Sequence, residues 1–194
     1  MILSTHPAFI FVAVPKTGSS SIERSLKGYQ DGALSKPFNK HVLAMKLQKE
    51  LPRVLWEGSY RAAFVREPFD WLHSWYRYRQ RDALRNPAHP RHGLDTGQIS
   101  FDQFALTFAD TELMLKQSDF ICTHAGELLV NFVGRFESLQ RDYVRLCHEL
   151  SIEAVELPLV NASEKSAAGL PQISDVAKEY VEEYFRQDFE LFGY

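Results

Sequence analysis

The sequence predicts an α/β domain of three layers, with helices on both faces of a mostly parallel central sheet. Three observations predict this fold class. Short apolar strands alternate with helices along the chain, the first clearly apolar strand has no polar position, and two strands lead through a polar loop directly into a helix. Ligands of such sheets bind at the carboxyl ends of the strands, so we expect a functional site in those loops.

The N-terminal third predicts one strand and two helices. Residues Ala8–Val14 are continuously apolar and predict a strand that is buried on both faces. A loop with proline and glycine ends this strand, and the hydroxyls that follow predict a capped helix over Ser19–Lys27. Gly28–Asn39 has the composition of a loop. Helical spacing over His41–Leu51 then predicts a helix with its histidine at the start.

The middle of the chain predicts a second junction between a strand and a helix. A strand is expected over Tyr60–Val65, a long helix over Pro68–Arg85 and a surface loop over Asn86–Gln98. A capping box of serine and glutamine introduces a further helix over Phe101–Phe108.

The C-terminal part repeats the alternation of strand and helix. We expect a strand over Leu128–Phe136, an amphipathic helix over Ser138–Leu150, an irregular segment over Val155–Ala168 and a last helix over Ile173–Phe185. The aromatic side chains near the end of the chain are expected to dock onto the domain, namely Phe189, Phe192 and Tyr194.

The composition indicates a single domain over residues 1–194. With 45% apolar and 13% aromatic residues, the chain has enough material for a core without disulfides or metals. A net charge of −3 argues against a nucleic-acid partner, although seven arginines gather between Arg61 and Arg91. Cys122 and Cys147 show no spacing typical of disulfide frameworks or zinc sites, so we expect reduced, buried thiols and no metal.

Targeting and membrane signals are not expected. The apolar run before Pro15 is not preceded by a basic leader or followed by a small-residue cleavage site. No apolar stretch reaches the roughly 20 residues of a membrane-spanning helix. The sequence therefore predicts a soluble, cytoplasmic protein.

The first candidate loop is Pro15-Lys16-Thr17-Gly18-Ser19-Ser20-Ser21, between the first strand and a helix. Backbone amides at a helix N-terminus favour a phosphate, Gly18 permits close approach, and the serines add hydroxyl donors. Lys16 precedes the glycine, whereas a Walker A loop has its lysine after it, so ATP hydrolysis and kinase chemistry are disfavoured. An ordinary turn between a strand and a helix is the alternative.

The second candidate segment runs from the end of the second strand into the long helix. Arg66 ends the strand, and Ser74 lies about two helical turns into the helix, so both are able to face one anion. Taken singly, each residue is better interpreted without a ligand, Arg66 in a salt bridge to a surface acid and Ser74 as an ordinary helix serine.

Together the two segments resemble the sulfotransferases that use 3'-phosphoadenosine 5'-phosphosulfate (PAPS), specifically the carbohydrate type. That family has a PKTGS-like loop and a VRxPxxRxxSxY-like segment, and the spacing from Arg66 to Ser74 agrees. Val133–Leu139 is similar to the family's GRFE-type strand end, so the resemblance covers most of the chain. It implies a P-loop-like sulfotransferase fold. One departure is Trp71, where many members have a second arginine and where the indole offers a stacking surface instead.

The resemblance also implies a distribution of roles. Lys16, Thr17, Gly18, Ser19, Ser20 and Ser21 would hold the 5'-phosphosulfate, and Arg66 and Ser74 the 3'-phosphate, with 3'-phosphoadenosine 5'-phosphate (PAP) as the product. Lys16 would neutralise the leaving oxygen, and His41 is the candidate general base by its position between the two segments. His6, Glu57 and His73 are weaker candidates. Trp71, Trp75 and Phe136 are available to cover adenine, but such aromatic residues are more often core.

The expected acceptor is a hydroxyl on a carbohydrate or glycolipid. Because 194 residues is short for that family, the acceptor site is expected to be open or completed by a second copy of the chain in a homodimer. Two alternatives remain: a non-catalytic nucleotide-binding module on the same fold, and a nucleotide-dependent phosphotransferase, which would need a Walker A lysine and a metal-holding acid.

Overall fold

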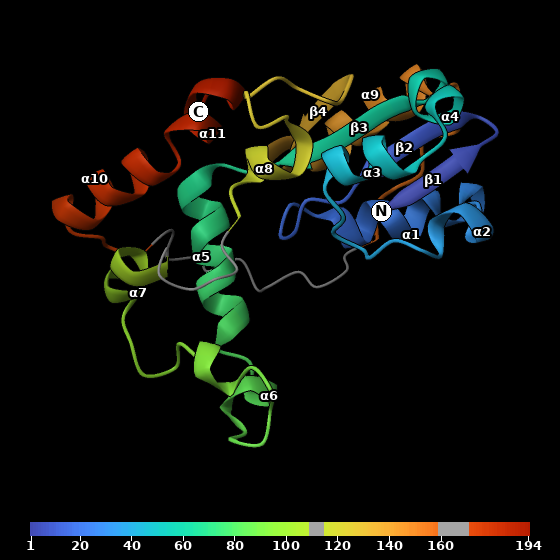
Figure 1. The fold of residues 1–194 in the computed structure, drawn as a ribbon. Coiled ribbons are helices and arrows are strands. Elements are labelled where there is room, and N and C mark those ends of the chain that lie inside the picture. The colour runs from blue at the N-terminus through green and yellow to red at the C-terminus, as the bar shows by residue number, and fades with distance from the viewer. Residues whose placement is uncertain (109–114, 159–170) are drawn as a thin grey trace. The chain divides into compact units, whose positions relative to one another are not determined.

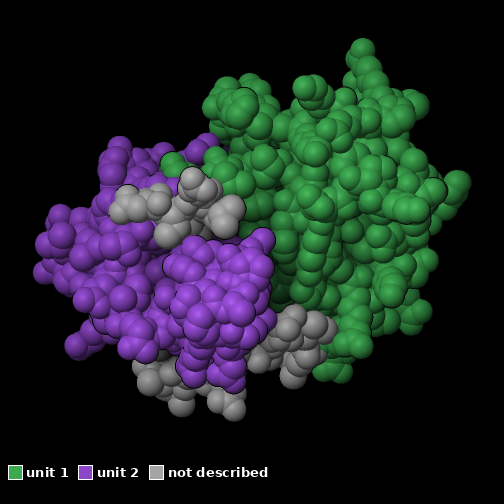
Figure 2. Space-filling view, turned by 60° about the horizontal axis from the view of Figure 1, so that its bottom comes forward, with its two compact units in different colours: residues 1–66, 115–163 green, residues 67–114, 164–194 purple. Residues whose placement is uncertain are grey.

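The computed structural model describes residues 1–108, 115–158 and 171–194, which form two compact units (Figure 2). The first unit contains residues 1–66 and the described residues from 115 to 158. The second unit contains residues 67–108 and 171–194. Most of the expected irregular segment Val155–Ala168 lies outside the described residues. The prediction of one domain stays a prediction.

The first unit is built on a sheet of four strands in the order β1-β2-β3-β4 (Figure 1). The strands are β1 (Ile2–Thr5), β2 (Ala8–Val12), β3 (Tyr60–Val65) and β4 (Phe132–Arg135). β1 runs antiparallel to β2, while β2 and β3, and β3 and β4, are parallel. The carboxyl ends of three parallel strands therefore lie at one edge of the sheet, which confirms the predicted mostly parallel topology.

Helices cover both faces of this sheet. The helical elements of the first unit are α1 (Ser19–Leu26), η1 (Lys27–Tyr29), α2 (Gly32–Ser35), α3 (Ala44–Glu50), α4 (Arg53–Gly58), α8 (Gln117–Ile121), η4 (Phe136–Ser138) and α9 (Leu139–Glu149). α1 and α9 share a hydrophobic cluster with alternate residues of the strands. α4 packs on β2, and α3 packs against α4 and α8. The expected α/β/α layering is confirmed.

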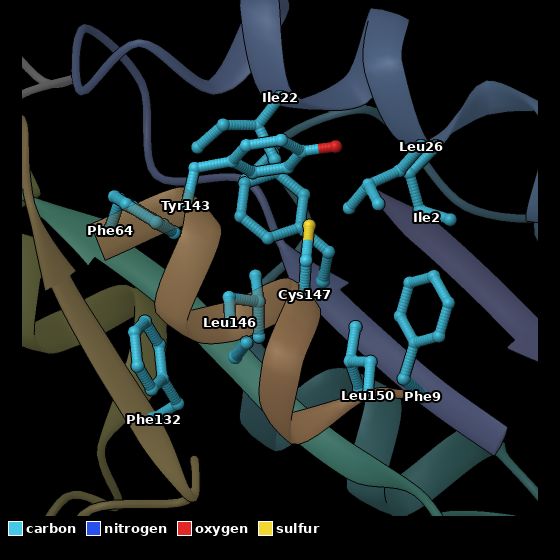
Figure 3. Close-up of a cluster of buried hydrophobic side chains, with 13 residues drawn as sticks. Ile2, Phe9, Ile22, Leu26, Phe64, Phe132, Tyr143, Leu146, Cys147 and Leu150 are labelled. Atoms are coloured by element: carbon cyan, nitrogen blue, oxygen red, sulfur yellow. The ribbon is translucent and has the colours of Figure 1, made fainter. Parts of the chain in front are cut away.

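A core of buried hydrophobic side chains lies between the sheet and the α1–α9 layer (Figure 3). Ile22 from α1, Tyr143 and Leu146 from α9, and Phe9 and Phe64 from the sheet converge there, and each is at most 1% exposed. Cys147 lies in the same cluster with a reduced thiol, and burial raises the pKa of that thiol. As expected from the sequence, the two cysteines are unbridged and buried.

Gly134 in β4 makes room for Phe64 in the neighbouring strand. The two residues are paired in register, and a Cβ atom at Gly134 would lie 2.4 Å from Cε1 of Phe64. That separation is far below van der Waals contact, so any side chain here displaces the phenyl ring. The glycine thus sets how closely the aromatic core packs on β4.

Asp142 joins the end of β4 to α9. Its Oδ2 atom accepts hydrogen bonds from the Arg135 amide, at 2.9 Å, and from the Ser138 hydroxyl, at 2.8 Å. Arg145 donates to Oδ1 at 3.3 Å. Burial by itself raises the pKa of the Asp142 carboxyl, but these hydrogen bonds and the nearby charge of Arg141 outweigh burial, so that the pKa is lowered. The ionised carboxylate therefore stabilises this junction.

The second unit is helical. Its elements are α5 (Pro68–Arg79), α6 (Asp82–Arg85), η2 (His92–Leu94), α7 (Phe101–Thr107), α10 (Asp175–Tyr184) and α11 (Arg186–Phe192). Aromatic residues form its core: Phe108 stacks on Phe185 with 5.3 Å between ring centroids, and Trp71 meets Phe185 edge-on. Phe189 packs against Phe69, which agrees with the expected docking of the aromatic end of the chain.

Several helix boundaries differ from the sequence prediction for tertiary reasons. The long helix ends at Arg79 instead of Arg85, because Thr96 donates its hydroxyl to the Tyr76 carbonyl, at 2.8 Å, and Arg81 is extended. The helix expected from His41 begins at Ala44, after an extended Leu43. The serine–glutamine capping box at the start of α7 is confirmed, with both hydrogen bonds present.

We predict that Gly134→Ala lowers the free energy of unfolding by about 1–3 kcal/mol, the usual cost of overpacking. Urea unfolding followed by circular dichroism measures this. Gly28→Ala is the matched control, because a Cβ atom at Gly28 meets no heavy atom within 4 Å. Equal stability of the two variants would contradict the role given to Gly134.

We predict that Asp142→Asn lowers stability at pH 7 by about 2 kcal/mol, since three hydrogen bonds to a charged group are weakened. The folded pKa of Asp142 is lowered, so its contribution is present above the unfolded pKa of about 3.9 and is lost as pH falls through the lower folded value. The difference from wild type should therefore shrink in urea titrations at pH 3. Asp82→Asn is the control, because the Asp82 side chain is 97% exposed, and this variant should change stability little at either pH.

Candidate functional site

The loop between β2 and α1 is the centre of the candidate site. Lys16 and Gly18 both have positive φ, of 66° and 76°. Positive φ in a turn gathers successive backbone amides into a concave surface of the kind that binds anions. A Cβ atom at Gly18 would lie 2.7 Å from Cδ2 of Leu139, so glycine is required both for the backbone and for packing on α9.

The start of α1 has no side-chain cap in the part of the chain that the structure describes. Gly18 is the N-cap residue, and the hydroxyl of Thr17 donates to the Val14 carbonyl, at 2.9 Å, instead of capping the helix. The predicted hydroxyl cap is therefore wrong. The backbone N–H groups in the first turn of this eight-residue helix therefore have no side-chain cap, and their partial positive charge is directed at the loop.

The serines of this loop differ in exposure. Ser19 and Ser21 are only 3% and 6% exposed, whereas Ser20 is half-buried and its hydroxyl accepts a hydrogen bond from Lys40 at 2.8 Å. Of the three hydroxyls that the sequence analysis singled out, Ser20 is thus the most accessible. Its partner Lys40 was not predicted, because a single lysine in a loop has no distinctive pattern.

His41 is bound to the beginning of the same loop. Its Nδ1 atom lies 2.7 Å from the Ala13 carbonyl oxygen. A carbonyl only accepts, so Nδ1 must carry the proton, and in the neutral ring Nε2 holds the lone pair. The residue as a whole is exposed, but its Nδ1 edge is partly buried. This burial lowers the pKa of His41, the bond to Ala13 opposes the change, and the charge of Lys40 lowers the pKa further.

Arg66 reaches the loop from the end of β3. Its guanidinium group donates to the Lys16 carbonyl at 3.2 Å and lies 4.0 Å from the centre of the Phe136 ring. The main chain of Arg66 is fixed by Gln117, which accepts from its amide at 2.8 Å and donates to its carbonyl at 2.7 Å. Phe136 therefore faces Arg66, in a cation–π contact. Gln117, fully buried and 51 residues away in sequence, was not predicted.

The first unit thus brings together the loop, His41 and Arg66. Ser74, the predicted partner of Arg66, lies in α5 of the second unit and is buried. The pairing of Arg66 with Ser74 stays a prediction. Within the second unit, Trp71 is 1% exposed and packs edge-on against Trp75 and Phe185. The suggestion that Trp71 offers a stacking surface is therefore wrong, because its indole is part of the core.

The weaker candidates for a general base have other surroundings. His73 stacks on Tyr76 and meets Phe101 edge-on, with 5.1 Å between ring centroids. Glu57 is paired with Arg53 at 2.7 Å on the surface of α4, and His6 is exposed in the turn between β1 and β2. His41 is the candidate whose hydrogen bond connects it to the loop.

Among the described residues 1–108, 115–158 and 171–194, no group of His, Cys, Asp and Glu side chains is arranged to hold a metal ion. In the same ranges no helix has the length and apolar character needed to cross a membrane.

One comparison with known protein families agrees with the resemblance drawn from the two motif segments. A family model described as the sulfotransferase family matches residues 1–194, the whole chain. Neither the curated proteins nor the solved structures that were compared gave a match. The family match includes the loop around Gly18, the end of β3 at Arg66 and the end of β4 at Arg135, which are the parallel strand ends described above. The chain therefore belongs to the sulfotransferase family.

Proposed function

We propose that this protein transfers a sulfuryl group from PAPS to a hydroxyl group of a carbohydrate or glycoconjugate. The observation that carries the proposal is that the loop before α1 is contacted by two side chains from distant parts of the sequence. His41 binds the Ala13 carbonyl before the loop's turn, and Arg66 binds the Lys16 carbonyl within it. A candidate base and a candidate phosphate ligand thus adjoin one helix N-terminus.

The loop has the chemistry that a phosphosulfate requires. Residues 16–21 combine a lysine, a left-handed glycine and the uncapped amide end of α1, all of which favour an anion. Arg66 carries a planar, permanently charged guanidinium group that suits a phosphate, and we assign it and Ser74 to the 3'-phosphate. The support for Ser74 is its spacing from Arg66 in the sequence.

The proposed reaction is an in-line displacement at sulfur, in which the bound donor supplies the sulfuryl group. Lys16 neutralises the charge that develops on the phosphate oxygen as its bond to sulfur breaks. Nε2 of His41 accepts the proton of the acceptor hydroxyl as the hydroxyl oxygen bonds to sulfur. The lowered pKa of His41 favours the neutral imidazole at neutral pH, so that Nε2 is free to accept a proton. No step in this scheme requires a metal ion.

A pocket beside α1, lined by both polar and apolar side chains, supports an acceptor with several hydroxyl groups. The pocket has a volume of about 420 Å³ and is lined in part by Ser20, Glu23, Asn39 and Lys40, with Phe38 as an aromatic surface. Charged, amide and hydroxyl groups around one aromatic ring are suited to a sugar, whose hydroxyls need hydrogen-bond partners and whose ring faces are apolar.

Two other functions are less well supported. A phosphotransferase would need the lysine after the glycine of the loop, whereas here Lys16 precedes Gly18. A non-catalytic nucleotide-binding module would have the same donor loop without a working base. His41, whose Nδ1–H donates to the Ala13 carbonyl and leaves Nε2 available, favours the enzyme.

We predict that PAP binds the wild type in the micromolar range, about −8 kcal/mol, in a calorimetric titration. Arg66→Ala should remove the preference for PAP over adenosine 5'-phosphate, because only PAP has a 3'-phosphate. Lys16→Ala should weaken both ligands by about tenfold or more, since a charge-assisted hydrogen bond is worth about 1.5–3 kcal/mol.

Lys46→Ala is the control for this titration, because its ammonium pairs with Glu50 in α3, and it should bind like the wild type. Thermal melts of each variant separate loss of binding from loss of folding. If ATP binds as well as PAP, or if no variant discriminates between the ligands, the proposed donor site is wrong.

We predict that His41→Ala lowers kcat by about 10²–10⁴ in a sulfotransfer assay with labelled PAPS, while PAP binding is retained. In the pH profile of kcat/KM of the wild type, the acid limb reports the pKa of the base in the free enzyme. Because burial lowers the pKa of His41, that limb should lie below the ordinary histidine value of about 6.5. Activity is lost as pH falls through it.

His124→Ala is the matched control, since His124 is exposed in a turn, and it should leave the rate unchanged. Full activity of His41→Ala would assign the base elsewhere. PAP binding without sulfotransfer by the wild type, tested with a range of sugar acceptors, would favour the non-catalytic module.

A further inference from the structure

Lys40 makes two polar contacts with α1. Its Nζ atom donates to the Ser20 hydroxyl at 2.8 Å and lies 2.9 Å from Oε2 of Glu23. Ser20 is in the first turn of α1, where the donor phosphosulfate is proposed to bind, and Glu23 is one turn further along the helix. Lys40 therefore connects a loop to the helix that begins the candidate site.

Lys40 and its neighbour His41 hold one segment at two points. His41 binds the Ala13 carbonyl before α1, and Lys40 binds Ser20 within α1. Residues 36–43 lie between α2 and α3 and contain no helix or strand of their own. The Lys40 carbonyl also accepts a hydrogen bond from the Met1 amino group, at 3.0 Å. Without a hydrogen-bonded ladder, the position of such a segment depends on contacts of this kind. The side-chain contacts of these two adjacent residues thus contribute to fixing where the imidazole lies.

We propose that Lys40 is a positioning residue for His41: its bonds to Ser20 and Glu23 hold residues 36–43 on α1 and keep a positive charge next to the imidazole. The catalytic consequence rests on the proposed function, in which His41 is the base. The structural and electrostatic parts concern only this chain and are measurable without a substrate.

The charged groups around His41 act in opposite directions. Burial is the largest influence and lowers the pKa of His41, and the positive charge of Lys40 adds to it. The bond to Ala13 and the negative charge of Glu23 raise the pKa, and the amino group of Met1, which is bonded to Glu23, lowers it. Lys40 and Glu23 therefore form a pair whose members should change the same histidine with opposite sign.

This behaviour distinguishes Lys40 from an ordinary surface lysine. Its side chain is 43% exposed, and exposed ion pairs contribute little to stability. We accordingly expect a small effect of Lys40 substitutions on unfolding and a clear effect on the titration of His41. If the contact between Lys40 and Glu23 were purely structural, removal of either partner would release the segment and change the pKa of His41 in the same direction.

The experiment measures the pKa of His41 by NMR from the ring Cε1 proton, assigned by the signal missing in His41→Gln. The chain has seven histidines, so one missing signal identifies the residue. In Lys40→Met the pKa should shift upward. In Glu23→Gln, where the bond from Lys40 to Ser20 remains, it should shift downward. Lys46→Met is the matched control, with its charge paired to Glu50, and should leave the titration unchanged.

Lys40→Arg keeps the positive charge and should leave the pKa close to the wild-type value. Shifts of the same sign in Lys40→Met and Glu23→Gln, or no shift in either, would overturn the proposal. If the NMR shifts have the expected signs but the acid limb of kcat/KM does not follow them, the role of Lys40 stands and His41 is not the base. Failure of Lys40→Met to fold leaves Glu23→Gln and Lys40→Arg as the deciding variants.

Discussion

Two carbonyl groups of one loop determine how the candidate site is assembled. A polar backbone group near the buried end of a strand must find a partner, because an unsatisfied carbonyl there costs free energy. The carbonyl of Ala13 is satisfied by His41 and that of Lys16 by Arg66. The same bonds that satisfy the backbone therefore bring together a candidate base and a cation from positions 28 and 50 residues away.

The loop is able to offer these carbonyls because of its packing on the end of the sheet. Gly18 approaches Leu139 too closely for a side chain, and Phe136, just before Leu139, lies under the guanidinium group of Arg66. Residues at the carboxyl end of β4 and at the start of α9 thus pack against the loop and against Arg66. Asp142, with its lowered pKa, secures that support by binding the Arg135 amide and the Ser138 hydroxyl.

Elements with a local cause were predictable from the sequence, and those with a distant cause were not. The strand Tyr60–Val65 and the capping box of α7 depend on neighbouring residues and were predicted with their observed bounds or bonds. The position of His41 outside its helix follows from a tertiary hydrogen bond, and the early end of α5 depends on Thr96. Gln117 fixes Arg66 from 51 residues away, which no local pattern indicates.

The cations of the first-unit site differ in ways that match different tasks. The chain has a net charge of −3, so a positive potential at this site must come from where the cationic side chains are placed and not from an excess of them in the chain. Arg66 is held by a carbonyl and an aromatic face, contacts that suit a planar and permanently charged group, whereas the ammonium of Lys40 is shared between a hydroxyl and a carboxylate. A fixed planar cation is suited to a phosphate that does not react. A lysine that is paired with a carboxylate next to a histidine is suited to adjusting the pKa of that histidine. The two charges have opposite signs and both act on the imidazole, and each can be changed separately.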